Sequence, residues 1–172
     1  MHFNEYCALA QRTSNSSLTV EQHVINGALG LCGEAGEAYE LYLNEDWDDY
    51  LESKLIEELG DVLWYCAELA SWVPNEFDTV MFGVVTPSST RLSTLCIQAA
   101  KIADIVKKAT MQGHALPREK IVCHVGCVVE IISAIAQRMG TDIETIEKLN
   151  IEKLQKRYPV KFSADQSINR EV

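Results

Sequence analysis

The sequence predicts an all-α protein, a helical bundle that occupies residues 1–172 as a single domain. Apolar residues recur over long stretches with the 3.6-residue period of amphipathic helices, and only 4 prolines occur among the 172 residues. With 47% apolar residues, the chain can bury a substantial core. The segment VMFGVV at residues 80–85 has the composition of a strand, but no second strand is evident to pair with it.

The helices are predicted one after another along the chain, at residues 3–12, 20–44, 53–73, 89–111, 117–139 and 141–157. Thr19 is a plausible N-cap of the second helix, and Thr141 or Asp142 starts the last one, because short polar side chains satisfy the free amides at helix starts. Residues 74–88 are less regular and are predicted to be a linker with some helical turns. The tail after residue 157 is expected to be extended and partly mobile.

A weak internal repeat relates two helical hairpins, residues 24–82 and 88–148, and leaves residues 149–172 as the C-terminal helix end and tail. LCGEAGEAYEL aligns with LCIQAAKIADI, and KLIEELGDVLWYCAELA aligns with KIVCHVGCVVEIISAIA, with Gly60 opposite Gly126. Two unrelated amphipathic hairpins would share part of this pattern by chance. Duplication is favoured because the register continues into FDTV and IETI.

Composition limits the classes of partner. The net charge is −10, and no basic stripe follows any segment, so a nucleic-acid backbone is not expected to bind. No apolar run is long enough to span a membrane and no signal peptide is evident, which favours a cytoplasmic protein. A metal-bridged anionic small molecule remains compatible with the charge, because a bound cation reverses the local field.

The cysteines are expected to be reduced and buried on apolar helical faces. They are Cys7, Cys32, Cys66, Cys96, Cys123 and Cys127. Cys123 and Cys127 lie one helical turn apart, with His124 pointing elsewhere on the same helix. Two thiols supply only half of a zinc site, so zinc is not favoured.

Acidic side chains beside the packing faces of two consecutive helices are the main functional signal. Glu34 and Glu37 flank the apolar stripe of the second helix one turn apart, with Asn26 nearby. Glu58 and Asp61 have the same spacing on the third helix. If these helices pack antiparallel, the four carboxylates converge, and they would repel one another unless a cation intervened. A set of oxygen ligands suits a hard divalent ion, magnesium or manganese.

The sequence leaves a second interpretation open, in which these acids are solvated helix faces that pair with lysines. The glycines of the second helix favour the metal-site interpretation. Each glycine costs about 0.5–1 kcal/mol relative to alanine inside a helix, so their recurrence indicates tight packing or backbone room for a ligand. They stand at Gly27, Gly30, Gly33 and Gly36.

The second hairpin cannot hold the same ion. Its residues at the positions aligned with the four acids are Gln98, Lys101, His124 and Cys127. This set does not bind a hard cation. One hairpin is therefore predicted to be chemical and the other to be its structural partner.

The acid-bearing segments resemble the MazG-like all-α nucleoside triphosphate pyrophosphohydrolases. The resemblance rests on LGLCGEAGEAYEL followed by KLIEELGDVLWYCAELA, and on NIEKLQKRYPVKFSADQSINRE near the C-terminus. The family pattern is E-E-x-x-E, a spacer, then E-x-x-D. Glu34, Glu37, Glu58 and Asp61 match the last four acids, whereas Gly33 stands where the family often has its first glutamate.

The resemblance implies a bundle related to the dimeric dUTPases. Relatives assemble as dimers or tetramers, and a homodimer is favoured here because the fused repeat could replace one partner within a single chain. It implies magnesium-dependent hydrolysis of a ribo- or deoxyribonucleoside triphosphate to the monophosphate and pyrophosphate. Such a reaction would remove unwanted nucleotides from the cellular pool. The four acids would hold the metal, and Glu34 or Glu37 would be the general base. By position, the residues that would contact phosphates or sugar are Asn26, Lys54, Tyr65, Asn150, Lys153 and Arg157, and His23 and Trp47 would touch the base.

Other classes compete with this prediction. A non-catalytic helical scaffold with a solvated acidic face is the main alternative. A di-iron carboxylate bundle requires Glu-x-x-His on two helices, and neither acid-bearing helix has that motif. Loss of activity after duplication is disfavoured because all four acids are retained.

Overall fold

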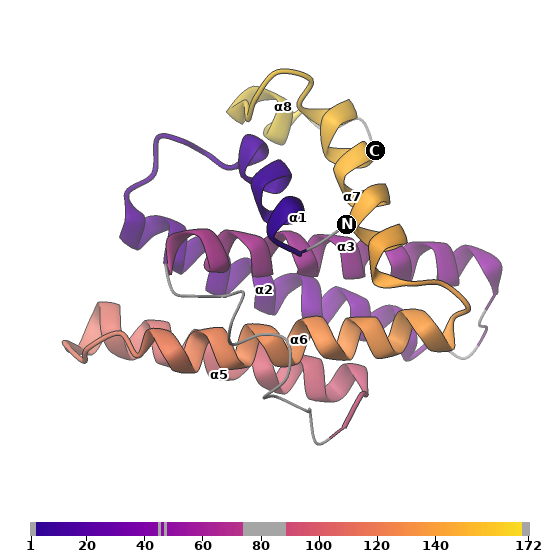
Figure 1. The fold of residues 1–172 in the computed structure, drawn as a ribbon, viewed down its shortest axis with the longest axis horizontal. Coiled ribbons are helices and arrows are strands. Elements are labelled where there is room, and N and C mark those ends of the chain that lie inside the picture. Colours follow the sequence, from indigo (N-terminus) through magenta and orange to yellow (C-terminus); the bar gives the residue numbers. More distant parts are fainter. Residues whose placement is uncertain (1–2, 45, 47, 74–88, 170–172) are drawn as a thin grey trace.

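A computed structural model describes residues 3–44, 46, 48–73 and 89–169 and confirms the all-α class (Figure 1). The described residues form helices and no strand. The elements are α1 (Phe3–Ala10), the 3-10 turn η1 (Gln11–Thr13), α2 (Val20–Tyr42), α3 (Asp49–Trp72), α5 (Leu92–Gln112), α6 (Arg118–Arg138), α7 (Ile143–Arg157) and α8 (Ala164–Ile168). None of these helices is long and apolar enough to cross a lipid bilayer.

Helix starts follow the predicted capping chemistry. The Thr19 side chain accepts a hydrogen bond from the Gln22 amide, and the Gln22 side chain accepts one from the Thr19 amide, which completes a capping box. Asp142 caps α7 as predicted. The third helix begins at Asp49 and not at residue 53, because Asp48 caps it and acidic residues in its first turn favour the helix dipole.

The tail differs from the prediction. Residues 164–168 form the short helix α8, capped by Ser163, where an extended chain was expected. Tyr158 and Phe162 lie with their ring centroids 5.5 Å apart, and this contact folds the start of the tail back on itself. The linker predicted at 74–88, including VMFGVV, lies outside the described residues.

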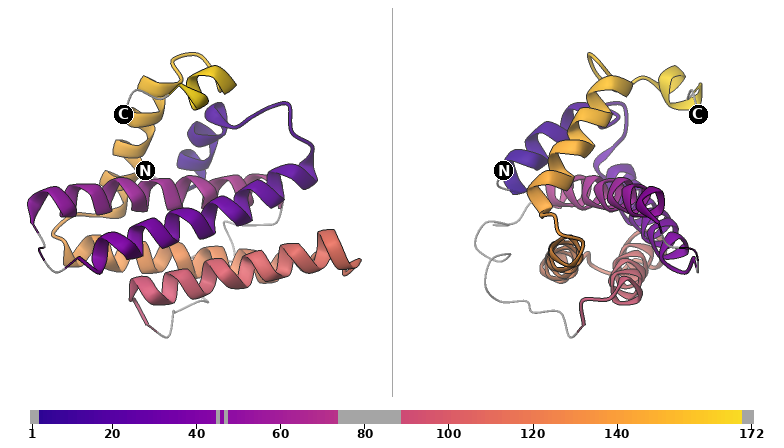
Figure 2. Two further views of the ribbon diagram at one scale, coloured as in Figure 1. Left: turned by 180° about the vertical axis from the view of Figure 1, so that it is seen from behind. Right: turned by 90° about the vertical axis from the view of Figure 1, so that its right-hand side faces the viewer.

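Two antiparallel hairpins lie side by side and form the body of the bundle. The first consists of α2 and α3 and the second of α5 and α6, with α2 packed against α5 (Figure 1). Viewed close to end-on, these helices form a four-helix arrangement, and α1 and α7 cover α3 on the opposite side from the second hairpin (Figure 2). This arrangement places α3 between α2 and α7, so its polar residues can meet both neighbours. The origin of the two hairpins by duplication remains a prediction.

The core fills the space between the hairpins. Leu31, Leu59, Ile102 and Ile132 come from the four long helices, and each has 0% of its surface exposed. Burial of one such side chain contributes about 1.5–3 kcal/mol of hydrophobic stabilisation. The core therefore holds the two acid-bearing helices in a fixed register.

The glycines of α2 have two different roles. A Cβ atom at Gly27 would lie 2.8 Å from Leu69 Cγ, and one at Gly30 would lie 2.1 Å from the Tyr65 ring. These two positions confirm the expected close approach of α2 and α3. At Gly33 and Gly36 a Cβ atom would meet nothing within 4 Å, so packing within the described chain does not explain them.

Glu147 of α7 is a buried carboxyl that makes stability depend on pH. It is 2% exposed, and among the described residues its Oε2 has no hydrogen-bond partner. Burial, and to a lesser degree the charges of Glu144 and Asp142, raise the pKa of Glu147 to about 7. The folded protein thus binds this proton more tightly than the unfolded chain, whose glutamate titrates near 4.5. The resulting stabilisation is full below pH 4.5 and is lost as the pH rises to about 7.

Replacement of Glu147 with glutamine should remove this pH dependence. We expect wild-type protein to lose about 1–3 kcal/mol of unfolding free energy between pH 5 and pH 8 relative to Glu147→Gln, measured by urea denaturation. Glu119→Gln, at an exposed site on α6, is the matched control and should follow the wild type. Parallel pH profiles for wild type and Glu147→Gln would contradict the assignment.

Candidate functional site

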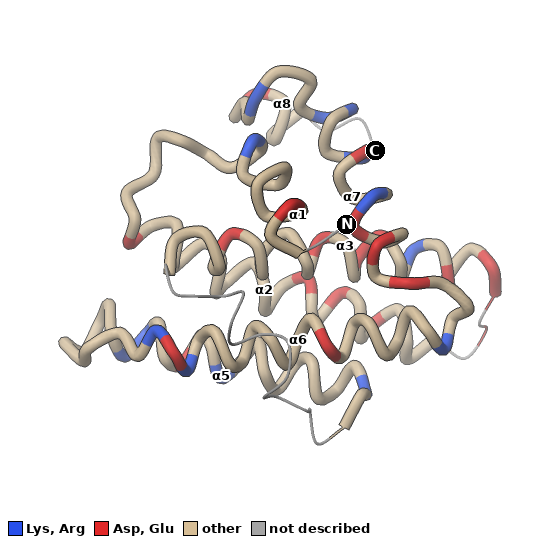
Figure 3. The backbone as a smooth tube through the Cα atoms, in the orientation of Figure 1, with Lys and Arg blue, Asp and Glu red and all other residues tan. Residues whose placement is uncertain are grey.

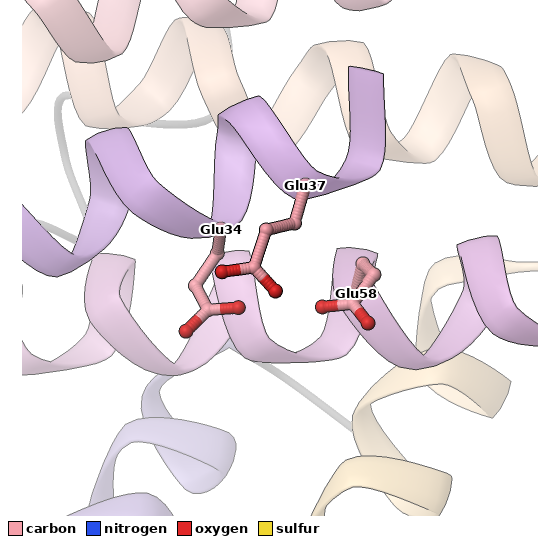
Figure 4. A group of neighbouring side chains, drawn as sticks. All are labelled: Glu34, Glu37 and Glu58. Carbon is pink, nitrogen blue, oxygen red and sulfur yellow. The ribbon is translucent and has the colours of Figure 1, made fainter. Parts of the chain in front are cut away.

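Three of the four predicted acids converge between α2 and α3. Glu34 and Glu37 extend from α2 toward Glu58 on α3 (Figure 4). Each supplies a carboxylate oxygen, and these oxygens lie within 4.8 Å of one another. Glu34 and Glu58 are half-buried and Glu37 is exposed, so the cluster stands at the edge of the packed interface. The antiparallel packing of two helices with the same i, i+3 spacing produces this arrangement.

The cluster retains protons in the absence of a cation. Burial, the charges of Asp61, Glu37 and Glu58, and a hydrogen bond with Glu58 raise the pKa of Glu34 to about 7. Burial and the charges of Asp61 and Glu37 also raise the pKa of Glu58. Like charges held this close favour the neutral form of one partner. A divalent cation would remove that repulsion.

Asp61 lies beside the three glutamates but is bonded to α7. Its Oδ1 accepts a hydrogen bond of 2.9 Å from Asn150 Nδ2, and its Oδ2 lies 2.5 Å from Lys153 Nζ. Its negative charge still reaches the cluster, since it contributes to the raised pKa of both Glu34 and Glu58. The predicted quartet is therefore a group of three glutamates with an adjacent aspartate that carries its own lysine.

Most of the residues predicted to contact substrate line two cavities. A groove of about 1140 Å³ between α3, α7 and α8 is lined by Lys54, Asn150, Lys153 and Arg157. Basic and acidic residues both occur along α7, and acidic residues predominate on the neighbouring α3 (Figure 3). The Lys54 ammonium is 2.9 Å from the carboxylate of Glu57, which partly offsets its charge. The lining also includes Asp49, Glu52, Glu57 and Glu152, so the cations of the groove stand among as many acids.

The second cavity is smaller, about 260 Å³, and borders the acid cluster. Its lining includes Glu34 and Asp61 together with the predicted contacts Asn26, Tyr65 and Arg157. Arg157 lines both cavities. The sequence-predicted acids and polar residues of α2, α3 and α7 therefore surround one region of the molecule.

His23 occupies a different place from the one predicted. It is 1% exposed, lines neither cavity, and lies with Nδ1 2.7 Å from Glu68 Oε1. Its ring stacks on Trp72 with centroids 4.0 Å apart. In this arrangement His23 connects α2 to α3 and presents no accessible surface to a nucleobase. Trp47, the other predicted base contact, lies outside the described residues.

Several cavity residues were missed by the sequence analysis. Lys156 lines the groove, and Trp64, Tyr158 and Phe162 line the smaller cavity. Lys156 follows Lys153 by one helical turn, a spacing that could have placed it on the same face of α7. The aromatic residues gave no separate signal, because their spacing is also that of a core.

The second hairpin contains a neutral counterpart of the acid cluster. Gln98 and His124, at the positions aligned with Glu34 and Glu58, approach within 2.7 Å between Oε1 and Nδ1. Burial and the charges of Lys101 and Lys120 lower the pKa of His124, which keeps the ring neutral near pH 7. None of the six cysteines, all of which lie in the described part of the chain, forms a disulfide. Among the described residues only the three glutamates form a metal-sized group of acidic, histidine or cysteine side chains.

Comparison of the chain with family models, curated proteins and solved structures finds no match.

Proposed function

We propose that this chain is a MazG-like, divalent-metal-dependent hydrolase that cleaves a nucleoside triphosphate to the monophosphate and pyrophosphate. The observation that carries the proposal is the convergence of Glu34, Glu37 and Glu58, with oxygens within 4.8 Å of one another. Asp61 adds a fourth negative charge beside them. Lys153 pairs with Asp61, and Arg157 lines the cavity that borders the cluster, so two cations suited to a polyanionic substrate lie beside the acids.

The donor set fits a hard divalent ion. All the ligand atoms on offer are carboxylate oxygens, which magnesium and manganese prefer over the softer metals. Burial, and after it the charges of Asp61, Glu37 and Glu58, raise the pKa of Glu34 to about 7, and a cation would offset the contribution of those charges. Glu34, Glu37 and Glu58 would hold the ion, with Asp61 at its side. When bound, such an ion neutralises phosphate charge, acts as a Lewis acid and acidifies a bound water.

Side chains of the protein would accept the proton of the attacking water and stabilise the leaving group. Attack of a water oxygen on the α-phosphorus breaks its bond to the bridging oxygen, which leaves with pyrophosphate, while the water proton passes to a carboxylate. Glu34 or Glu37 is the candidate acceptor of that proton. Lys153 and Arg157 would steady the negative charge of the leaving pyrophosphate.

The alternative is a helical scaffold whose acids are only solvated. The exposure of Glu37 is compatible with that alternative. Half-burial of Glu34 and Glu58 against each other is not the arrangement of acids placed for solubility, because burial of like charges destabilises the fold. Addition of magnesium and a nucleoside triphosphate should raise the melting temperature of the enzyme and leave that of a scaffold unchanged.

A panel of nucleotides tests the proposal. The purified chain is incubated with each common ribo- and deoxyribonucleoside triphosphate and magnesium, and monophosphate and pyrophosphate are measured separately. We expect equal amounts of the two products from at least one nucleotide, and none when a chelator removes the metal. Release of inorganic phosphate in place of pyrophosphate, or no cleavage of any nucleotide, would refute the proposed reaction.

A further inference from the structure

A buried hydrogen-bond chain connects α1 to Asp61. Tyr6 is 0% exposed, and its hydroxyl donates to Asn150 Oδ1 over 2.8 Å. Asn150 is 3% exposed and in turn donates from Nδ2 to Asp61 Oδ1 over 2.9 Å. One side-chain amide thus receives a proton donor on its oxygen and presents its own donor to a carboxylate.

The packing of α7 against α3 makes this chain of contacts possible. A Cβ atom at Gly60 would lie 3.0 Å from the Asn150 Cβ and 3.1 Å from its Nδ2. A larger residue at position 60 would press against Asn150. Glycine at this position lets α7 pack closely against α3 next to Asp61. The glycine inside the acidic segment therefore has a local explanation, which is space for the asparagine that holds the neighbouring acid.

The Asp61 carboxylate and the Tyr6 hydroxyl together fix which way the Asn150 amide faces. An amide has one acceptor side and one donor side, and only the donor side can face a carboxylate favourably. Because the carboxylate only accepts, Nδ2 faces Asp61, and this leaves Oδ1 to accept from Tyr6, whose hydroxyl has Gly60 O, 3.4 Å away, as a second acceptor. Lys153 holds the second oxygen of Asp61, so both oxygens have partners on α7.

We propose that Tyr6 is a positioning residue that acts through Asn150 to hold the Asp61 carboxylate beside the metal site of the three glutamates. The inference rests on the proposed function and assigns to α1 a part in it. Tyr6 touches neither cavity and is not a catalytic residue. Partners of this kind, one step removed from a metal, typically change metal affinity or activity by about 10–100-fold when mutated.

The test measures metal binding in the absence of nucleotide. Mn²⁺ affinity is determined by electron paramagnetic resonance of the free ion for the full chain, Tyr6→Phe, Asn150→Ala and the double variant. Tyr6→Phe keeps the ring and removes only the hydroxyl, and we expect it to weaken Mn²⁺ binding about 10-fold. Because Tyr6 acts through Asn150, the double variant should bind no more weakly than Asn150→Ala alone.

A variant of the same helix separates positioning from general loosening of α1. Phe3 is 4% exposed and lies with its ring centroid 6.0 Å from that of Tyr6. Its side chain has no polar atom, so it takes no part in the hydrogen-bond chain. Phe3→Leu should lower stability and leave Mn²⁺ affinity unchanged. This comparison with Tyr6→Phe stands by itself if Asn150→Ala does not fold.

The outcomes distinguish the inference from the proposed function. Wild-type affinity in Tyr6→Phe, an equal loss in Phe3→Leu, or additive losses in the double variant would overturn the role of Tyr6 and leave the metal site in place. Absence of Mn²⁺ binding by the wild-type chain would remove the proposed function, and the role of Tyr6 would be lost with it.

Discussion

Replacement of Glu37 with glutamine is expected to lower magnesium-dependent pyrophosphate release by about 10²–10⁴-fold and to leave the fold intact. Glu37 is the exposed member of the acid cluster, so an uncharged amide of the same shape should not disturb the packing of α2. The change replaces one of the three converging carboxylates with a neutral amide and removes a candidate general base. Asp61→Asn should have a comparable effect, since it removes the negative charge that faces Lys153 and the cluster.

The measurement is the initial rate with the nucleotide that wild-type protein cleaves fastest, at saturating magnesium. Glu40→Gln is the matched control, because Glu40 is an exposed acid of the same helix outside the cluster. It should retain the wild-type rate, and unfolding curves should show that Glu37→Gln remains folded. Full turnover by Glu37→Gln would show that the cluster does not perform the chemistry.

Replacement of Glu68 with alanine is expected to lower the free energy of unfolding by about 3–5 kcal/mol. Glu68 is 1% exposed and collects polar groups from three elements. Its oxygens receive hydrogen bonds from Gln11 Nε2 over 3.0 Å and Ser14 Oγ over 3.1 Å, and Oε1 lies 2.7 Å from His23 Nδ1. Alanine would leave these donors buried without their acceptor.

Urea denaturation at pH 7 measures this loss. Glu57→Ala serves as the control, because Glu57 is an exposed acid of the same helix and its ion pair with Lys54 is worth no more than about 1 kcal/mol. Equal stabilities of Glu68→Ala and Glu57→Ala would mean that the His23–Glu68 network does not hold η1 and α2 to α3. Since this network lies apart from both cavities, a folded Glu68→Ala protein should still bind Mn²⁺.

The long helices could be predicted because their signal is periodic. The stripe through Leu31 and Ala35 in α2 and the stripe through Leu59 and Val62 in α3 are both buried as predicted. Helix ends were less certain. Asp48 extended α3 by a turn, and Ser163 started α8 in a tail whose polar composition resembles a loop.

The part of the candidate site that could be predicted is the part in which residue spacing along one helix determines the face from which a side chain projects. Glu34, Glu37 and Glu58 converge because the i, i+3 pattern places them beside the packing face. The partners of Asp61 come from residues 89 and 92 positions away in sequence, and no local pattern pairs such residues. In the same way, nothing local shows that His23 is buried, because its partner Glu68 is 45 residues away.

Anomalous diffraction from a crystal grown with Mn²⁺ tests the central claim most directly. The account predicts an anomalous peak within coordination distance of carboxylate oxygens of Glu34, Glu37 and Glu58, with Asp61 at its side. An ordered ion at another position, or a cluster whose carboxylates turn to solvent with no peak between them at saturating Mn²⁺, would contradict it.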